Sequence, residues 1–162
     1  MASGGSGFSD VSETAILDNA TVGLGRTLYI ALFKWTGTAG AGADNTINDN
    51  GTFPTNVVEV STGGYARVSL ASTDWNAATG TAPASKSTNA TKSWTASGAA
   101  FGELCGWGLY TASTGGTFVA GGTLTNSVGA ATSVTVNSGE TFQFDATNPI
   151  KMQLGDPSDT FA

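Results

Sequence analysis

The stretch TLYIALFKW, which runs from Thr27 to Trp35, decides the fold class. It is rich in β-branched and aromatic residues, contains neither glycine nor proline, and is typical of a β-strand. Side chains alternate between the two faces of a strand, and here both faces are apolar. One face carries Leu28, Ile30 and Leu32, and the other carries Tyr29, Ala31, Phe33 and Trp35. Such a strand needs a second cover, which a helix at residues 10–22, a long loop or another copy of the chain could supply.

The same signals predict strands along most of the remaining chain. Short runs of β-branched and aromatic residues are separated by glycine, asparagine and serine. The predicted strands are Thr27–Trp35, Val57–Ser61, Tyr65–Ala71, Ala99–Phe101, Leu104–Tyr110, Thr117–Leu124, Thr132–Val136, Thr141–Asp145 and Ile150–Leu154. We therefore predict an all-β fold, an antiparallel β-sandwich of jelly-roll-like type, with one short N-terminal helix and two long loops.

The helix is expected over residues 10–22. Asp10 can cap it, and Glu13 stands three residues later, as in a capping box. Residues 1–9 are a Gly/Ser-rich leader, which we expect to be an arm held by a neighbouring subunit. The expected organisation is an N-terminal arm at 1–9 and a single β-sandwich domain at 10–162.

The two long connections are Thr36–Asn56 and Ser72–Ser97. Both are rich in glycine, alanine, threonine and asparagine, and both carry little charge. Loops of this length are uncommon unless they bind something or extend as arms. We expect them to lie across neighbouring protein subunits.

The composition excludes several classes of function. Six basic and twelve acidic residues give a net charge of -6, and the basic residues form no cluster of the kind that binds nucleic acid phosphates. No segment has the apolar length of a membrane helix, and the first residues lack the basic and apolar segments of a secretory signal. A lone cysteine, Cys105, excludes an internal disulfide and fits synthesis in a reducing cytoplasm.

The residues also give little support for catalysis. The chain has no histidine, the residue best suited to proton transfer near neutral pH and the commonest zinc ligand. Glu59, Glu103 and Glu140 could supply a glycosidase pair, but a strand-edge glutamate facing water is the simpler interpretation of Glu103. The segment Asp44–Gly51 could offer oxygen ligands to calcium, although it does not fit the EF-hand pattern and an Asx-rich turn explains it. We predict no catalytic residue, no metal site and no cofactor.

Two of the four tryptophans lie in the second long connection. Trp75 and Trp94 are harder to explain there by an internal core than by a partner, because aromatic residues anchor interfaces. They could also be the stacking platforms of a carbohydrate-binding module. The predicted partner interface consists of Phe8, Tyr29, Phe33, Trp35, Trp75 and Trp94.

A series of motifs resembles a family of small bacteriophage structural proteins, often labelled tail fibre or virion proteins. The series consists of LYIALF at Leu28–Phe33, GGYAR at Gly63–Arg67, GWGLY at Gly106–Tyr110, Gly115-Gly116 and GETFQF at Gly139–Phe144. The family pattern has LYVALF, GGYAR, WGIYD, GG and GDTFxF in the same order, after a helix. The resemblance covers residues 10–154. It departs from the pattern after Phe33, where Lys34-Trp35 leads into the long first connection.

The resemblance implies a component of the phage particle with no catalytic residues. Among such components we expect a capsid decoration or cement protein, made in the host cytoplasm and placed on the capsid surface. Its partners would be the major capsid protein and copies of itself in a homo-oligomer, with no nucleic acid and no membrane. Long arms suit this role, because many small contacts add through multivalency. The alternatives are a tail or head fibre subunit and a carbohydrate-binding module.

Overall fold

The structure, a computed structural model, describes residues 17–19, 24–36, 56–79, 84–125 and 131–154. These residues group into two compact units. The sandwich unit comprises the described residues of Leu28–Leu70 and Ser93–Gln143. The terminal unit comprises those of Met1–Thr27, Ala71–Lys92 and Phe144–Ala162. The expected arm at 1–9 lies outside the described residues, and the single domain at 10–162 stays a prediction.

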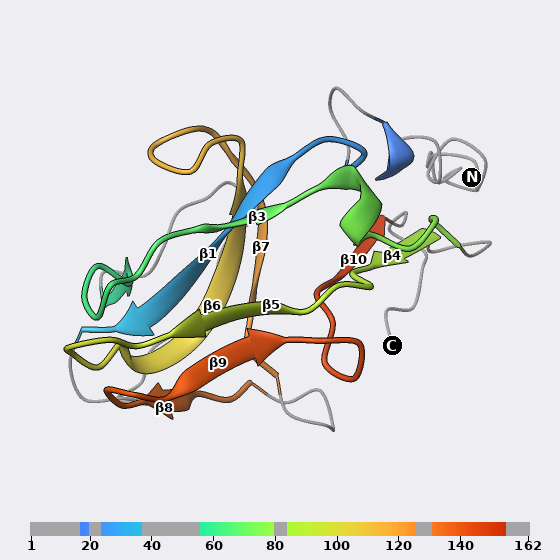
Figure 1. Cartoon of the computed structure of the whole chain (residues 1–162). Coiled ribbons are helices and arrows are strands. Elements are labelled where there is room, and N and C mark those ends of the chain that lie inside the picture. Colours follow the sequence, from blue (N-terminus) through green and yellow to red (C-terminus); the bar gives the residue numbers. More distant parts are fainter. Residues whose placement is uncertain (1–16, 20–23, 37–55, 80–83, 126–130, 155–162) are drawn as a thin grey trace, which may run out of the picture. The chain divides into compact units, whose positions relative to one another are not determined.

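A six-stranded antiparallel sheet forms the main layer of the sandwich unit (Figure 1). Its two central strands are β1 (Leu28–Trp35) and β6 (Gly102–Tyr110), which pair along most of their length. On the outer side of β1 lie β2 (Val57–Glu59) and β3 (Val68–Leu70), one after the other. On the outer side of β6 lie β7 (Phe118–Thr123) and β8 (Val134–Val136). The two long strands rich in aliphatic and aromatic residues therefore occupy the centre of the sheet.

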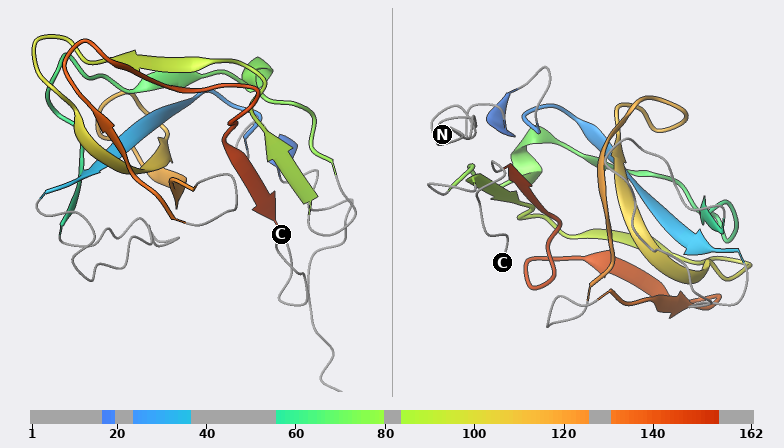
Figure 2. Two further views of the ribbon diagram at one scale, coloured as in Figure 1. Left: turned by 90° about the horizontal axis from the view of Figure 1, so that it is seen from below. Right: turned by 180° about the vertical axis from the view of Figure 1, so that it is seen from behind.

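A second layer consists of β5 (Lys92–Thr95) and β9 (Thr141–Phe144). Figures 1 and 2 show this pair stacked on one face of the β1–β6 sheet. The Trp94 indole belongs to this layer: it is buried, packs against the ring of Phe142 with 6.3 Å between centroids, and donates a hydrogen bond to the Ala66 carbonyl. The prediction of an antiparallel all-β sandwich is confirmed.

Both faces of β1 are covered within a single chain. On one face Leu28, Ile30 and Leu32 are fully buried, with Leu70 and Leu109 as cross-strand neighbours. On the other face Ala31, Phe33 and Trp35 form a buried cluster with Val57 and Cys105, against which Tyr110 and Phe118 pack. The apolar side chains of β1 other than Tyr29 are therefore core residues of this chain, and a role of the strand in an interface stays a prediction.

Glycine in β6 makes room for that second cluster. Ala31 lies opposite Gly108 in the register of β1 and β6. A Cβ at position 108 would stand 2.9 Å from Cε2 of Phe33 and 3.1 Å from Cε2 of Phe118, closer than side chains tolerate. The GWGLY motif thus combines a buried tryptophan with a glycine over which two aromatic rings close.

The terminal unit is built around a second two-stranded sheet. Its strands are β4 (Ala84–Ser87) and β10 (Lys151–Leu154), and a short 3-10 helix, η1 (Ser72–Asp74), precedes Trp75. Ion pairs join Lys92 to Asp74, with 2.6 Å between Nζ and Oδ2, and Lys86 to Asp18. Leu17 and Asp18 are helical, and the rest of the helix expected at 10–22 lies outside the described residues.

The expected loop at Ser72–Ser97 is wrong in its later half. It contains η1, β4 and β5, because ASKS and KSWT become strands by pairing with β10 and β9, which lie far along the sequence. Such short polar strands carry little local signal and depend on tertiary context. The predicted strand at Ala99–Phe101 is also absent, since β6 begins at Gly102. Most of the other long connection, Thr36–Asn56, lies outside the described residues.

We predict that Gly108→Ala lowers the free energy of unfolding by about 1–3 kcal/mol, because the added methyl group overpacks the space between two buried rings. Urea unfolding followed by tryptophan fluorescence measures this change. Gly122→Ala in the neighbouring strand is the matched control, since the nearest atom to its Cβ, Trp107 Cζ2, would be 3.3 Å away. Equal stability of Gly108→Ala and the unmodified protein would contradict the assigned packing.

Candidate functional site

The site begins where β1 changes its neighbour from β2 to β3. Phe33 lies opposite Glu59 in β2, and Ile30 lies opposite Val68 in β3. Between these two positions, the Leu32 carbonyl accepts a hydrogen bond from Val60 N at 3.0 Å. The Leu32 N–H, which points toward the same side of β1, has no backbone partner in β2 or β3. The Tyr65 hydroxyl fills the position and accepts the Leu32 N–H at 2.9 Å. A side chain therefore replaces one rung of the backbone ladder in the middle of the sheet.

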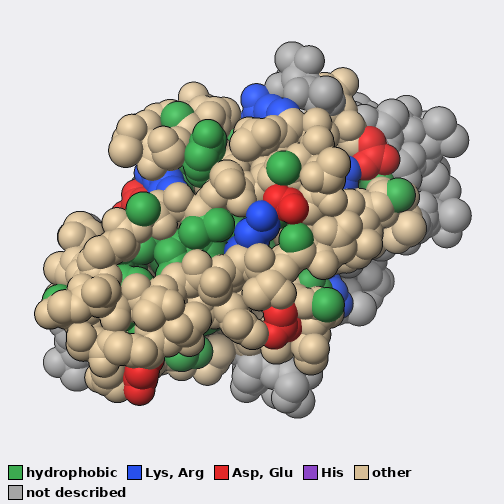
Figure 3. Space-filling model, viewed as in Figure 1, with side chains coloured by type: hydrophobic (Ala, Val, Ile, Leu, Met, Phe, Trp, Pro, Cys, Tyr) green, Lys and Arg blue, Asp and Glu red, His purple; other side chains and the backbone are tan. Residues whose placement is uncertain are grey.

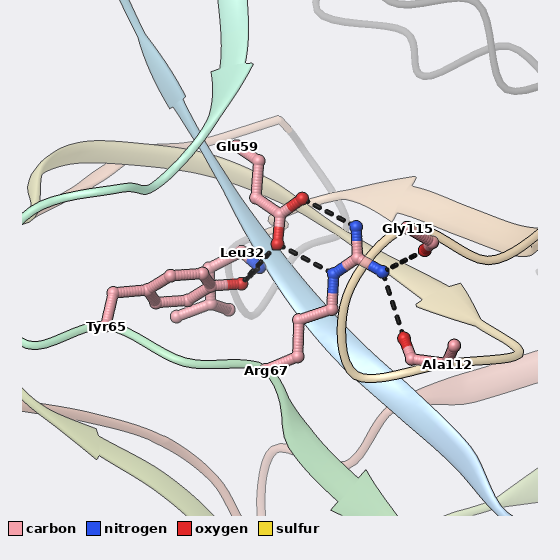
Figure 4. Close-up of polar contacts among 6 residues, drawn as sticks. All are labelled: Leu32, Glu59, Tyr65, Arg67, Ala112 and Gly115. Carbon is pink, nitrogen blue, oxygen red and sulfur yellow. Dashed lines mark hydrogen bonds and ion pairs between the residues drawn. The ribbon is translucent and has the colours of Figure 1, made fainter.

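An ion pair holds that tyrosine in place (Figure 4). The Tyr65 hydroxyl donates to Oε1 of Glu59 at 3.1 Å, and Nε of Arg67 donates to the same oxygen at 2.8 Å. Nη2 of Arg67 donates to Oε2 at 2.7 Å, which makes the pair bidentate. Bidentate arginine–carboxylate pairs fix geometry as well as charge. We call Glu59, Tyr65 and Arg67 the clamp.

The clamp also reaches the turn between β6 and β7. Nη1 of Arg67 donates to the carbonyl oxygens of Ala112, at 3.0 Å, and Gly115, at 2.6 Å. The guanidinium carbon lies 3.8 Å from the centroid of the Tyr110 ring, a cation–π contact. Gly115 and Gly116 have φ of 58° and 77°, the left-handed conformations that glycine adopts without strain and that a tight turn requires. One side chain thus ties the β2–β3 connection to a turn far along the sequence.

The two glycines of GGYAR turn the chain into the clamp. Gly63 and Gly64 have φ of 67° and 70°. A Cβ on Gly63 would stand 2.4 Å from the carbonyl oxygen of Ala99, so this position accepts only glycine. The turn directs Tyr65 and Arg67 to the same side of β1 as Glu59 (Figure 4).

Electrostatics make the clamp a structural element and not a reactive one. Burial, followed by the nearby Glu59 carboxylate, raises the pKa of Tyr65 far above its usual value, so the hydroxyl keeps its proton. The hydrogen bonds to Glu59 raise the pKa of Arg67. Both carboxylate oxygens are engaged by the guanidinium, which leaves Glu59 poorly suited to act as a base.

A shallow hollow of about 320 Å³ opens beside the clamp. It is lined by Glu59, Tyr65, Ala66, Arg67, Ser113, Thr114 and Gly115. All of these residues belong to the sandwich unit, and the last three form the exposed tip of the β6–β7 turn. The volume lies at the lower end of the range of roughly 300–1,000 Å³ that is usual for ligand pockets.

The residues of the predicted partner interface do not meet at this site. Phe8 lies outside the described residues, Tyr29 is half-buried, and Phe33 and Trp35 are in the cluster on the second face of β1. Trp75 and Trp94 are buried at 5% and 4% exposure, the first in the terminal unit and the second in β5. Their burial within one chain gives each an internal role, and a role in an interface stays a prediction.

The other candidate residues are engaged locally. Glu103 accepts a hydrogen bond from the Ser133 hydroxyl, and Glu140 accepts one from the Asn137 N–H, which lowers the pKa of that carboxyl. A lowered pKa is the opposite of what a general acid needs. The segment Asp44–Gly51 lies outside the described residues, and the described part of the chain contains no metal-binding group of three or more acidic or cysteine residues.

The sequence signal for the clamp is GGYAR, because a glycine pair before a tyrosine and an arginine marks a turn that delivers two polar side chains. The sequence does not indicate that Glu59 is the partner of Tyr65 and Arg67. Glu59 and Arg67 are eight residues apart with a turn between them, and no helical or strand periodicity predicts such a contact.

A protein-family model described as Podophage GP4 fiber I protein gp80 matches residues 7–150. The chain belongs to this family. No curated protein and no solved structure matches it. The resemblance to phage structural proteins is confirmed at the level of the family, and the family description supports the fibre alternative better than the capsid decoration protein. In the described residues, no helix has the length and apolar character needed to span a membrane.

Tyr65→Phe tests the side chain that completes the β1 ladder. The change leaves the partly buried Leu32 N–H without an acceptor, and we expect it to lower the free energy of unfolding by about 1–3 kcal/mol. Tyr29→Phe is the matched control, because the Tyr29 hydroxyl makes no hydrogen bond with another described residue, and it should change stability little. Hydrogen exchange at Leu32 should accelerate in Tyr65→Phe alone, and unchanged protection there would contradict the assignment.

Arg67→Lys keeps the charge but loses the planar fork. We expect it to destabilise the protein by about 2–3 kcal/mol, because the bidentate pair and the two carbonyl contacts cannot all be remade. A double-mutant cycle with Glu59→Gln should give a coupling free energy above about 1 kcal/mol. Arg26→Lys is the control, since the buried Nε of Arg26 has no hydrogen-bond partner among the described residues. Additive effects of the two clamp variants would show that the pair is not a unit.

Proposed function

We propose that the chain is a structural subunit of a fibre on the phage particle, where it assembles with copies of itself. The observation that carries the proposal is the family match over residues 7–150. The fold is consistent with this role, because both faces of the central strand β1 are buried within one chain, so each subunit has its own core. The polar groups of the clamp hold one another in place and form no set of reactive groups.

The surface suits assembly through many weak contacts. On the face shown in Figure 3, backbone and side chains that are neither charged nor hydrophobic cover most of the surface, hydrophobic side chains show as a band and scattered spots, and charged side chains stand singly or in small groups. Among the described residues the only large hydrophobic side chains that are exposed are Val58 and Val134, each at 41%. Interfaces of this character are wet and individually weak, and repetition along a fibre makes their sum strong.

Labelling of intact particles tests where the protein lies. Gold-labelled antibodies raised against the purified chain should decorate thin appendages in electron micrographs, and quantitative mass spectrometry should find far fewer copies than of the major capsid protein. Uniform labelling of the shell, with a copy number close to that of the capsid protein, would overturn the fibre proposal in favour of a decoration protein.

Cross-linking tests self-assembly in the same particles. Of the lysines, Lys151 is exposed, whereas Lys34 and Lys92 are half-buried and Lys86 is buried. An amine-reactive reagent should therefore join copies of the chain mainly through Lys151, and Lys151→Arg should remove most of these links. Links from Lys151 only to the capsid protein would contradict assembly with copies of itself.

A further inference from the structure

We propose that the hollow beside the clamp binds a neutral, hydroxyl-rich ligand of the saccharide class. Its lining brings together the Glu59–Arg67 ion pair and three hydroxyl-bearing side chains, those of Tyr65, Ser113 and Thr114, from segments far apart in the sequence. The inference does not depend on the fibre assignment, because it concerns what the isolated chain binds.

The charges of the hollow are already balanced. Arg67 donates four of its five N–H groups, two to Glu59 and one each to the carbonyls of Ala112 and Gly115. The Arg67 side chain is 8% exposed and its guanidinium lies against the Tyr110 ring, so it offers little to an anion. The Glu59 charge is neutralised by the same arginine, which removes the attraction for a cation. A neutral ligand is what remains.

Hydrogen-bonding capacity is nevertheless left over. Among the described residues, Oε2 of Glu59 accepts a hydrogen bond from Nη2 of Arg67 alone, and the Glu59 side chain is 30% exposed, so one further donor can approach it. Ser113 and Thr114 are exposed, and their hydroxyls make no hydrogen bond with another described residue. Each hydroxyl can both donate and accept. An acceptor that lines the same hollow as two such groups matches neighbouring hydroxyls on a sugar ring, each of which also donates and accepts.

The turn that carries these hydroxyls is held in advance. Arg67 binds the carbonyls on both sides of Ser113 and Thr114, those of Ala112 and Gly115, and Thr111 N donates to the Thr117 carbonyl at 3.0 Å to close the turn. Binding groups that are already fixed lose less conformational entropy when a ligand arrives. The clamp thus both fixes the turn that carries the two hydroxyls and supplies the Glu59 acceptor.

Titration of the isotope-labelled chain with free sugars tests the site. The probes are glucose, galactose, mannose, rhamnose and N-acetylglucosamine, with glucuronate as the anionic counterpart. At least one neutral sugar should shift the amide signals of Ser113, Thr114 and Gly115 in nuclear magnetic resonance spectra, with a dissociation constant in the millimolar range, and glucuronate should bind more weakly than glucose.

The double variant with Ser113→Ala and Thr114→Val removes both free hydroxyls. It should weaken binding of the best sugar by about tenfold, since two hydrogen bonds of modest strength are lost. Thr135→Val is the matched control and should bind as the unmodified protein does, because Thr135 is exposed in β8 and its hydroxyl makes no hydrogen bond with another described residue. Well-dispersed spectra of all variants show that each is folded.

Three results would overturn the proposal: no shift with any neutral sugar at about 100 mM, well above a weak dissociation constant, shifts that cluster away from the β6–β7 turn, or binding that the double variant leaves unchanged. Tighter binding of glucuronate than of glucose would identify an anion site instead. None of these results bears on whether the protein lies on a fibre, which the particle labelling decides.

Discussion

The change of neighbour along β1 is the constraint on which the sandwich unit depends. A central strand that is paired first with β2 and then with β3 leaves one inward position without a backbone partner, and buried N–H groups are rarely left unpaired. The Tyr65 hydroxyl supplies that partner for Leu32, and it is held by Glu59 and Arg67. The same arginine also binds the β6–β7 turn, so the side chains that complete the β1 ladder also fix the position of this turn.

The two apolar faces of β1 are explained by packing within one chain. A strand with two apolar faces suggests that another chain covers one of them, and aliphatic and aromatic residues of this chain bury both. Glycine makes this arrangement possible, because a side chain at position 108 would collide with the rings of Phe33 and Phe118. The apolar side chains of β1 other than Tyr29 are therefore buried inside the domain.

The strands could be predicted from the sequence where their signal is local. Thr27–Trp35 and Leu104–Tyr110 were expected within two residues of the observed β1 and β6, because bulky strand-forming residues fill them. The strands β4 and β5 were not expected, since ASKS and KSWT have no such residues except Trp94 and exist through pairing with distant partners. The clamp is not predicted from the sequence. The glycine pair of GGYAR indicates a turn, but only the register of β2 on β1 brings Glu59 to Tyr65 and Arg67.

In the β6–β7 turn, the groups that fix the backbone are different from the side chains at its exposed tip. Two sets of hydrogen bonds fix the turn: Arg67 donates to the carbonyls of Ala112 and Gly115, and Thr117 N donates to the Thr111 hydroxyl at 2.9 Å. The conformations of Gly115 and Gly116 are set by glycine alone. The side chains of Ser113 and Thr114 are exposed and make no hydrogen bond with another described residue. A turn position that faces water accepts most residue types. A rigid frame that leaves two adjacent outward side chains unconstrained is the arrangement in which recognition can be altered while stability is kept.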